Sequence, residues 1–380
     1  MSHSFAPERV DTGRKVDPVL MGVLILLIGS GLSVLFSSSF FRAEQLFSDP
    51  LRFLRGQTVF VTLGVILASV LARVPLSWMQ RFVAPILGVS LILMVLTFVP
   101  GFGTEFYGAR RWIIVFGQSF QPSELVKVVL VLYLAYLLSR KQEMLDDPVN
   151  ALLPPFLVLA VFSALIYMQN DFSTAVFTVL LGLAMFFVAG APLRYFFGLL
   201  LTAGPLGLIL LLTREHRVNR LLAYIDPSLD PAGSGYQVLA AERALKAGGA
   251  WGRGLGMSTE KLGSLPEVQS DFIFAVVAEE TGYFGVIVVI GLFALFAWRG
   301  YSIAMHASDS FRSYLAFGLT TLILGQALLN IAVVGGAVPA TGLPLPFFSS
   351  GGSATLMTLV ACGLILNVSR DQTQRGGFSG

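Results

Sequence analysis

Residues 152–190 read LLPPFLVLAVFSALIYMQNDFSTAVFTVLLGLAMFFVAG, two apolar runs that are separated only by the polar pair Asn170-Asp171. Each run has about the length of a helix that crosses the hydrocarbon core of a bilayer, which is roughly 30 Å thick. In lipid, the backbone polar groups of each run need partners within the run itself, and a helix provides them. The stretch therefore predicts a tight membrane hairpin of two helices.

The same pattern extends along the whole chain of 380 residues, of which 55% are hydrophobic and only 12% are charged. An ordinary soluble domain carries about 25% charged residues. We therefore predict an all-α polytopic membrane protein with about ten transmembrane helices in one bundle. The ten expected spans are 18–36, 56–72, 82–99, 123–139, 152–169, 172–190, 194–213, 271–298, 313–334 and 353–369.

The polar stretch between the seventh and eighth spans, residues 214–270, predicts one large extracytoplasmic loop. An even number of spans places both termini on one side. With the loop set aside, twelve Lys and Arg residues lie on the terminal side and five on the other, so the positive-inside rule makes the termini cytoplasmic. The predicted organisation is a disordered cytoplasmic N-terminus (1–17), a ten-helix domain (18–369) and a short cytoplasmic tail (370–380), all in the cell (inner) membrane.

Several classes of function lack the residues that they need. The single cysteine, Cys362, rules out an internal disulfide and a cysteine-cluster metal site. The basic residues are scattered between apolar runs, so no nucleic-acid-binding surface is expected. No HExxH motif, Walker loop or dinucleotide fingerprint occurs, and none of the three histidines stands beside a candidate nucleophile. The sequence therefore gives no support for triad-type hydrolysis or ATP-driven transport.

The eighth span begins with a carboxylate, Asp271, and Glu279 and Glu280 follow within the same apolar run. An ionisable group in a span is costly to desolvate and is a functional candidate by default. A continuous helix over 271–298 would be about 42 Å long, so it would extend outward and place Asp271 at or above the headgroups. The alternative, that Asp271 only caps the helix, is open at this point.

A second group of polar residues lies before and at the start of the fourth span. Glu124 and Lys127 are three residues apart on nearly the same helix face, so they can pair at the outer edge of the bundle. Upstream, Arg110 and Arg111 beside Trp112 suit a phosphate ligand at a membrane surface. The pair can equally order the helix, and the arginines can equally anchor the chain to anionic lipid.

A third group precedes the last span, in PATGLPLPFFSSGGSATLM (339–357). A backbone with these prolines and paired glycines cannot face lipid, so we expect it to be buried in protein or to line a cavity. Hydroxyls and backbone N–H groups at a helix N-terminus favour an anion, phosphate especially. A structural turn with a serine cap is equally consistent with the pattern. The candidate residues of this turn are Ser349, Ser350, Gly351, Gly352 and Ser353.

Several stretches together resemble one known family. They are FGQSFQPSELVK, HRVNRLLAYIDPSLDPAGSGYQ, GRGLG with LPEVQSDFIFAVVAEETGYFG, and GLPLPFFSSGGSATL. This set is similar to the SEDS family (shape, elongation, division, sporulation), the membrane peptidoglycan polymerases typified by RodA and FtsW. The chain departs from the family pattern at QNDFSTAV (169–176), where a proline more often follows the glutamine. It departs again at QSDF, which replaces the usual His-Thr before the aspartate.

The resemblance implies glycan polymerisation on the outer face of the cytoplasmic membrane. Lipid II disaccharides would be joined, and an undecaprenyl diphosphate carrier would leave from the donor glycan. The resemblance makes Asp271 essential, as a general base, as a ligand of a divalent cation (Mg²⁺ or Mn²⁺), or as both. The cationic residues would neutralise the departing diphosphate. The substrate-binding residues that it implies are Arg110, Arg111, Glu124, Lys127, Ser349, Ser350, Gly351, Gly352 and Ser353.

The resemblance also implies partners: a class B penicillin-binding protein with transpeptidase activity, other membrane proteins of the elongation complex, and membrane lipid. The chain looks more like the RodA-type enzymes of elongation and rod shape than the FtsW-type division polymerases. Two other classes of function are alternatives, a flippase for lipid II and a scaffold that only recruits a transpeptidase. A flippase needs polar groups along a path through the membrane, whereas here nearly all cluster at one face. A scaffold would leave Asp271 without a role.

Overall fold

The computed structural model describes residues 16–106, 108–115, 117–141, 152–229, 234–259 and 269–370. Within this part of the chain, each of the ten predicted spans corresponds to an apolar helix. Eight of these helices are long and apolar enough to cross a membrane, and two, α5 and α6, are shorter. The ten are α1 (Pro18–Phe47), α2 (Arg52–Leu71), α3 (Leu76–Leu96), α4 (Pro122–Arg140), α5 (Leu153–Met168), α6 (Phe172–Val188), α7 (Leu193–Leu212), α10 (Ile273–Met305), α11 (Ser310–Val334) and α12 (Gly352–Arg370). The predicted all-α polytopic fold is confirmed.

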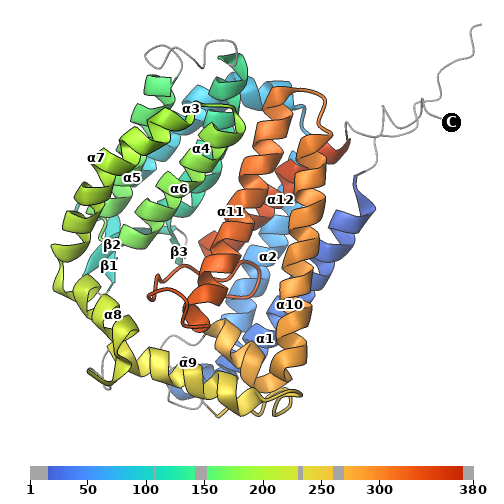
Figure 1. The fold of residues 1–380 in the computed structure, drawn as a ribbon. Coiled ribbons are helices and arrows are strands. Elements are labelled where there is room, and N and C mark those ends of the chain that lie inside the picture. The colour runs from blue at the N-terminus through green and yellow to red at the C-terminus, as the bar shows by residue number, and fades with distance from the viewer. Residues whose placement is uncertain are drawn as a thin grey trace, which may run out of the picture.

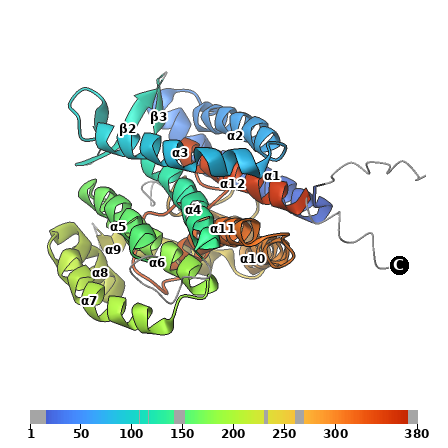
Figure 2. The ribbon, with the colours of Figure 1, turned by 90° about the horizontal axis from the view of Figure 1, so that it is seen from above.

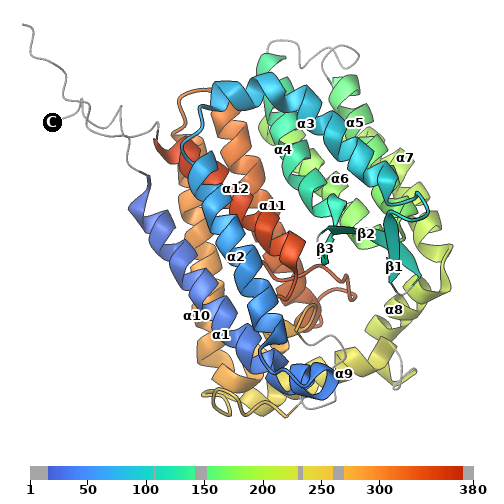
Figure 3. The same cartoon turned by 180° about the vertical axis from the view of Figure 1, so that it is seen from behind.

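The centre of the bundle is formed by α4, α11 and α12. Helix α12 packs against α2, α4 and α11, while α10 packs against α1 and α11 (Figures 1 and 3). Gly363 of α12 lies so close to α2 that a Cβ at this position would come within 2.5 Å of the Ala68 Cα. Such close approach through small residues is how helices associate where lipid supplies no hydrophobic driving force. Helix α7 lies at the edge of the bundle (Figure 2).

The start of α1 and the end of α12 lie side by side. The Asp17 side chain caps α1 by accepting a hydrogen bond from the backbone N–H of Leu20 at 2.7 Å, and it pairs with Arg299. The backbone N–H of Asp17 donates to the Ser369 hydroxyl at 3.1 Å. The start of the first span and the end of the last span therefore lie on the same side of the bundle, as the even number of spans predicted. Residues 1–15 of the predicted disordered segment and residues 371–380 of the predicted tail lie outside the described residues.

The described parts of the large loop 214–270 are mostly helical. They contain α8 (Glu215–Ile225), the 3₁₀ turn η3 (Pro227–Leu229) and α9 (Ser234–Gly248). Helices α8 and α9 lie at the end of the bundle opposite the last turn of α12, and we call this the loop end (Figure 1). Helix α9 packs against α10 and buries three alanines there: Ala240, Ala241 and Ala244. The predicted large loop between the seventh and eighth spans is therefore folded into helices where the structure describes it, and α9 packs against α10.

A small antiparallel sheet between α3 and α4 was not predicted from the sequence. Its strands are β1 (Gly103–Phe106), β2 (Ala109–Val115) and β3 (Gln118–Phe120), in the order β1-β2-β3 (Figure 3). Ile113 pairs with Gly103 on one side and with Phe120 on the other. Gly108 and Gly117 adopt positive φ values of 74° and 75° at the two connections, a conformation typical of tight hairpin turns.

Helix α10 is bent at Gly282, where φ is 65° and ψ is −165°. The bend frees backbone groups on both sides, and the turn formed by residues 249–254 binds them. The backbone N–H groups of Arg253 and Gly254 donate to the carbonyls of Glu279 and Glu280, and those of Tyr283 and Phe284 donate to the carbonyls of Gly249 and Ala250. The predicted continuous helix over 271–298 is therefore wrong: α10 begins at Ile273, bends at Gly282 and continues to Met305.

Candidate active site

Asp271 lies in the turn that precedes α10, where its side chain is partly exposed. The N-cap residue of α10 is Phe272, which makes no side-chain capping hydrogen bond. Asp271 therefore does not occupy the N-cap position that the alternative assigned to it. The carboxylate lies beside the connection between α11 and α12 (residues 335–351), because a Cβ on Gly342 would be 3.7 Å from Asp271 Oδ2.

Three hydrogen bonds fasten the backbone of residues 269–271. The Ser349 hydroxyl donates to the Ser270 carbonyl at 2.5 Å, and the Ser350 N–H donates to the Gln269 carbonyl at 2.7 Å. The Asn330 side chain donates to the Asp271 carbonyl at 2.9 Å. The sequence placed Asp271 and the serine–glycine turn about 80 residues apart, and the structure brings them together.

The serine–glycine turn contributes less free hydrogen-bonding capacity than the sequence indicated. Besides its bond to Ser270, Ser349 Oγ accepts from the Leu345 N–H at 2.8 Å. Ser353 Oγ accepts from the Gln121 N–H at 2.9 Å and so ties α12 to the end of the sheet. Both side chains are buried. The anion-cradle prediction is therefore narrowed to the three partly exposed residues between them: Ser350, Gly351 and Gly352.

Glu124 and Lys127 form the predicted ion pair, with 2.7 Å between Lys127 Nζ and Glu124 Oε1. The prediction that they pair at the outer edge of the bundle is wrong, since the side chains are only 7% and 1% exposed. They line a small cavity of about 10 Å³ with residues of α11 and α12, including Gln326 and Thr358. A charged pair in such surroundings depends on both partners, because either charge alone would be buried without compensation.

The two arginines of β2 have different surroundings. Arg110 pairs with Glu105 at 3.0 Å, and both side chains are half exposed. Arg111 pairs with Asp171 at 3.4 Å and donates to the carbonyls of Gln169 and Asn170 at 3.1 and 2.5 Å. Arg111 therefore joins the sheet to the α5–α6 hairpin, while Arg110 stays at the surface of the sheet.

Positive charge gathers where β2 approaches α8. The pKa of His216 lies below its ordinary value, first because the ring is partly desolvated and then because of the charges of Arg217, Arg220, Arg214 and Arg111. Arg217 stacks over the rings of Tyr167 and Phe172. The loop end thus carries a cluster of cations on the side of the α5–α6 hairpin.

The carboxylates of α10 that follow Asp271 are tied within the protein. Glu279 is fully buried and accepts hydrogen bonds from the Ser258 hydroxyl at 2.5 Å and the Thr259 N–H at 2.8 Å, and it pairs with Arg253 at 3.2 Å. Glu280 accepts from the Ser37 hydroxyl of α1 at 2.6 and 2.7 Å. These contacts hold the bend of α10 against α1 and the loop, so both carboxylates have structural partners.

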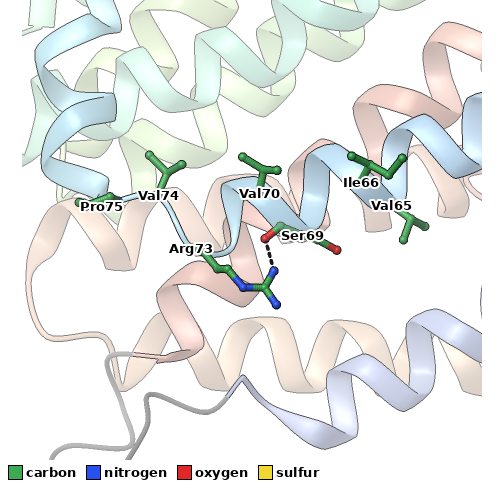
Figure 4. Close-up of a pocket in the computed structure, with 7 residues that line it drawn as sticks. All are labelled: Val65, Ile66, Ser69, Val70, Arg73, Val74 and Pro75. Atoms are coloured by element: carbon green, nitrogen blue, oxygen red, sulfur yellow. Dashed lines mark hydrogen bonds between the residues drawn. The ribbon is translucent and has the colours of Figure 1, made fainter. Parts of the chain in front are cut away.

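Among the described residues, no group of three or more His, Cys, Asp or Glu side chains could hold a metal ion. A large open hollow of about 580 Å³ lies elsewhere, along α2 and the turn after it (Figure 4). Its lining includes Arg73, which donates to the Ser69 carbonyl at 2.6 Å. This hollow adjoins the end of the bundle where α12 finishes, because Asn367 donates to the carbonyls of Leu71 and Val74. It therefore lies far from Asp271.

Sequence reasoning missed Asn330 and Gln57. Gln57 of α2 is buried and donates to the Ser349 carbonyl at 3.2 Å and to the Thr355 hydroxyl at 2.6 Å, so it supports the serine–glycine turn. A signal for both was present, since each is an amide residue within an apolar run, where a polar side chain is costly unless it has partners.

Comparison with known proteins agrees with this architecture. The chain matches the model of the FtsW, RodA and SpoVE family, described as a cell cycle protein family, over residues 18–374. The chain belongs to this family. It is 40% identical over 351 residues to the probable peptidoglycan glycosyltransferase FtsW of Borreliella burgdorferi, covering 92% of this chain and 95% of the relative. It is 38% identical over 367 residues to stage V sporulation protein E of Bacillus subtilis, covering 94% and 99% of the two chains.

Two solved structures share the fold. One is a chain of a peptidoglycan synthase complex, studied for the structural coordination of polymerization and crosslinking. It is 28% identical, with a TM-score of 0.75 and coverage of 94% of this chain and 99% of that chain. The other is the rod shape determining protein RodA of Thermus thermophilus, 26% identical, with a TM-score of 0.68 and coverage of 96% and 99%.

Proposed function

We propose that this protein is a peptidoglycan glycosyltransferase that polymerises lipid II at the outer face of the cytoplasmic membrane. The observation that carries the proposal is Asp271, a carboxylate held outside any helix and fastened through its backbone beside the 335–351 connection. The names of the relatives support the same activity. In this proposal the loop end faces outward, and both termini are cytoplasmic.

Asp271 acts as general base in the proposed reaction. The acceptor's 4-hydroxyl oxygen attacks the anomeric carbon of the donor glycan, and its proton passes to the Asp271 carboxylate. The bond from the anomeric carbon to the diphosphate oxygen breaks, and undecaprenyl diphosphate leaves. Attack opposite the leaving group converts an α-linked donor into a β-linked glycan. Because hydrogen bonds hold the backbone of Asp271 in place, its carboxylate loses little orientational freedom when the reaction begins.

The departing diphosphate needs positive charge and N–H donors. Arg111 and the cations of α8 gather on one side of the loop end. The partly exposed residues Ser350 and Gly351 directly precede α12, and Gly352 begins it, where a helix N-terminus favours an anion. We propose that these groups neutralise the leaving group, as developing charge is best stabilised by fixed donors. Lys127 acts at most indirectly, because its side chain is buried against Glu124.

A divalent cation fits this site in one way. The described residues contain no group of three or more His, Cys, Asp or Glu side chains that could hold a metal ion, so a cation bound by Asp271 would take most of its ligands from the substrate and from water. Mg²⁺ is commonly held in this way, by one or two carboxylates together with substrate phosphates and water. Bound there, Mg²⁺ or Mn²⁺ would offset the charge of the diphosphate.

A lipid II flippase is the competing class. Such a protein needs a polar path wide enough for a headgroup, whereas the charged pair inside the bundle lines a cavity of only about 10 Å³. The remaining candidate residues belong to the loop end. This distribution supports polymerisation over transport.

The test uses purified protein with a class B penicillin-binding protein as partner, labelled lipid II, and Mg²⁺ or EDTA. Glycan-chain length is compared between the native chain, Asp271→Ala and the isosteric Asp271→Asn, after all three give the same thermal unfolding. We expect polymer only from the native chain, and a loss of polymer with EDTA. Full polymer from Asp271→Asn would remove the general-base role. Transport of labelled lipid II across vesicles without any polymer would favour the flippase.

The cellular role has two candidates. The resemblance in sequence predicts elongation, together with partners of the elongation complex. Three relatives at 37–40% identity are named FtsW, which supports a division polymerase instead, and another at 38% identity is named stage V sporulation protein E. Depletion of the protein from its host separates the two roles, since loss of division gives filaments and loss of elongation gives rounded cells.

A further inference from the structure

Asn330 joins the two segments that surround the Asp271 carboxylate. It lies on α11, four residues before the helix ends, and is 1% exposed. Its Nδ2 donates to the backbone carbonyls of Asp271 and Leu343, both at 2.9 Å. A single buried side chain therefore connects the turn before α10 to the 335–351 connection.

These two segments define where the carboxylate lies. Gly342, the neighbour of Leu343, adopts a φ of 74°, and a Cβ there would be 3.7 Å from Asp271 Oδ2. Asp271 lies two residues before the first residue of α10, so the backbone of its own turn sets the position from which its side chain extends. The Asn330 amide thus holds both the backbone of Asp271 and the neighbouring 335–351 connection in place.

The oxygen of the Asn330 amide, Oδ1, indicates that this position requires the Nδ2 donor. Asn330 Oδ1 is buried and accepts no hydrogen bond from any described residue. A buried acceptor without a donor is unfavourable, and an apolar side chain of similar volume would avoid it. That apolar side chain would, however, remove the Asn330 donor from the Asp271 and Leu343 carbonyls. The structure retains the amide in spite of its unsatisfied oxygen.

We propose that Asn330 is a positioning residue for Asp271 in the glycosyl transfer reaction. It makes no contact with substrate in this assignment; it acts through the backbone of Asp271. The inference rests on the proposed function, because it assumes that Asp271 acts on the substrate.

Asn367 supplies a matched control. Its Nδ2 donates to two backbone carbonyls, those of Leu71 and Val74, at 2.5 and 2.7 Å, and the residue is also buried, with 8% of its surface exposed. It lies near the end of α12 at the opposite side of the bundle. Asn330→Ala and Asn367→Ala therefore remove the same kind of double hydrogen bond, one beside Asp271 and one far from it.

Polymerisation is measured for both variants over a range of lipid II concentrations. Misplacing a reacting group by about 1 Å can cost on the order of 10²-fold in rate. We expect Asn330→Ala to lower kcat on that order with little change in KM, and Asn367→Ala to keep the native kcat. A native kcat in folded Asn330→Ala overturns the proposal. If that variant does not fold, Asn330→Ser, whose hydroxyl can serve one carbonyl, is measured instead, and the same two outcomes decide.

Hydrogen exchange gives a readout that does not depend on activity. We expect Asn330→Ala to increase amide exchange at residues 269–272 and 342–345 together, and Asn367→Ala to leave both segments unchanged. Unchanged exchange at the two segments in Asn330→Ala would also overturn the proposal. Failure of the proposed role of Asp271 would give a different result. Asp271→Asn would then still make polymer, while Asn330→Ala would still increase amide exchange at the two segments.

Discussion

The bend of α10 predicts that a single added methyl group is strongly destabilising. Gly282 has a backbone conformation (φ 65°, ψ −165°) that is essentially restricted to glycine, and holding another residue there costs about 1–3 kcal/mol. A Cβ at this position would also lie 2.3 Å from the Gly252 N. Gly282→Ala must therefore push the 249–254 turn away and weaken the four backbone hydrogen bonds across the bend, each contributing about 0.5–1.5 kcal/mol. We expect a total loss of about 3–9 kcal/mol if all four bonds are lost, and less if some of them persist.

Gly291 of the same helix provides the control. A Cβ there meets nothing within 4 Å, and Gly→Ala inside a helix is neutral or favourable by about 0.5–1 kcal/mol. Thermal unfolding of both variants in the same lipid nanodisc measures the difference. Gly282→Ala should unfold at a clearly lower temperature than Gly291→Ala and should lose polymerisation, because Glu279 and Arg253 no longer hold the start of α10. Equal unfolding temperatures for the two variants would refute the claim that the bend is held by the turn.

Three further predictions concern charged groups. Glu124→Gln leaves the buried ammonium of Lys127 without its partner, so we expect a loss of about 3–5 kcal/mol in unfolding free energy; the double variant with Lys127→Met should recover much of it, and additive losses would contradict the pairing. Arg111→Lys cannot serve Asp171 and two carbonyls together, so the unfolding temperature should fall, and an unchanged one would show that these contacts do not hold the sheet. The lowered pKa of His216 means that the unfolded chain binds more protons, so stability is full above the ordinary histidine pKa of about 6.5 and falls as pH drops through the folded pKa. His216→Asn should flatten this part of the stability–pH curve, and an unaltered slope would argue against both the desolvation of the ring and the effect of the arginines around it.

The number and order of the spans could be predicted because each is set by local composition. The Asn170-Asp171 break is an example: Asn170 takes a positive φ of 64°, and Asp171 caps α6 by accepting from the Thr174 N–H. Helix and turn are both determined there by residues next to one another. The Glu124–Lys127 pair was predicted for the same reason, since three residues of spacing bring two side chains to one helix face.

The features that the sequence did not predict depend on contacts between distant segments. The bend at Gly282 interrupts a continuous apolar run, and the residues that bind its freed backbone groups lie about 30 positions earlier. The burial of Lys127 depends on α11 and α12 closing over it. Ser349 was predicted to bind an anion because its hydroxyl lies in a glycine-rich turn, but that hydroxyl donates to Ser270. Hydrophobic pattern alone carries no information on such pairings.

The short helices α5 and α6 have a consequence for the membrane around the protein. With 16 and 17 residues they are about 24–26 Å long, less than the roughly 30 Å of a typical hydrocarbon core. Such a mismatch is relieved when lipid tails shorten or tilt beside the protein, at a fraction of a kcal/mol per Å. We therefore expect the bilayer to be thinner beside α5 and α6, so that the outer headgroups lie deeper there than around α1. Helix α1, with 30 residues, is longer than the hydrocarbon core is thick.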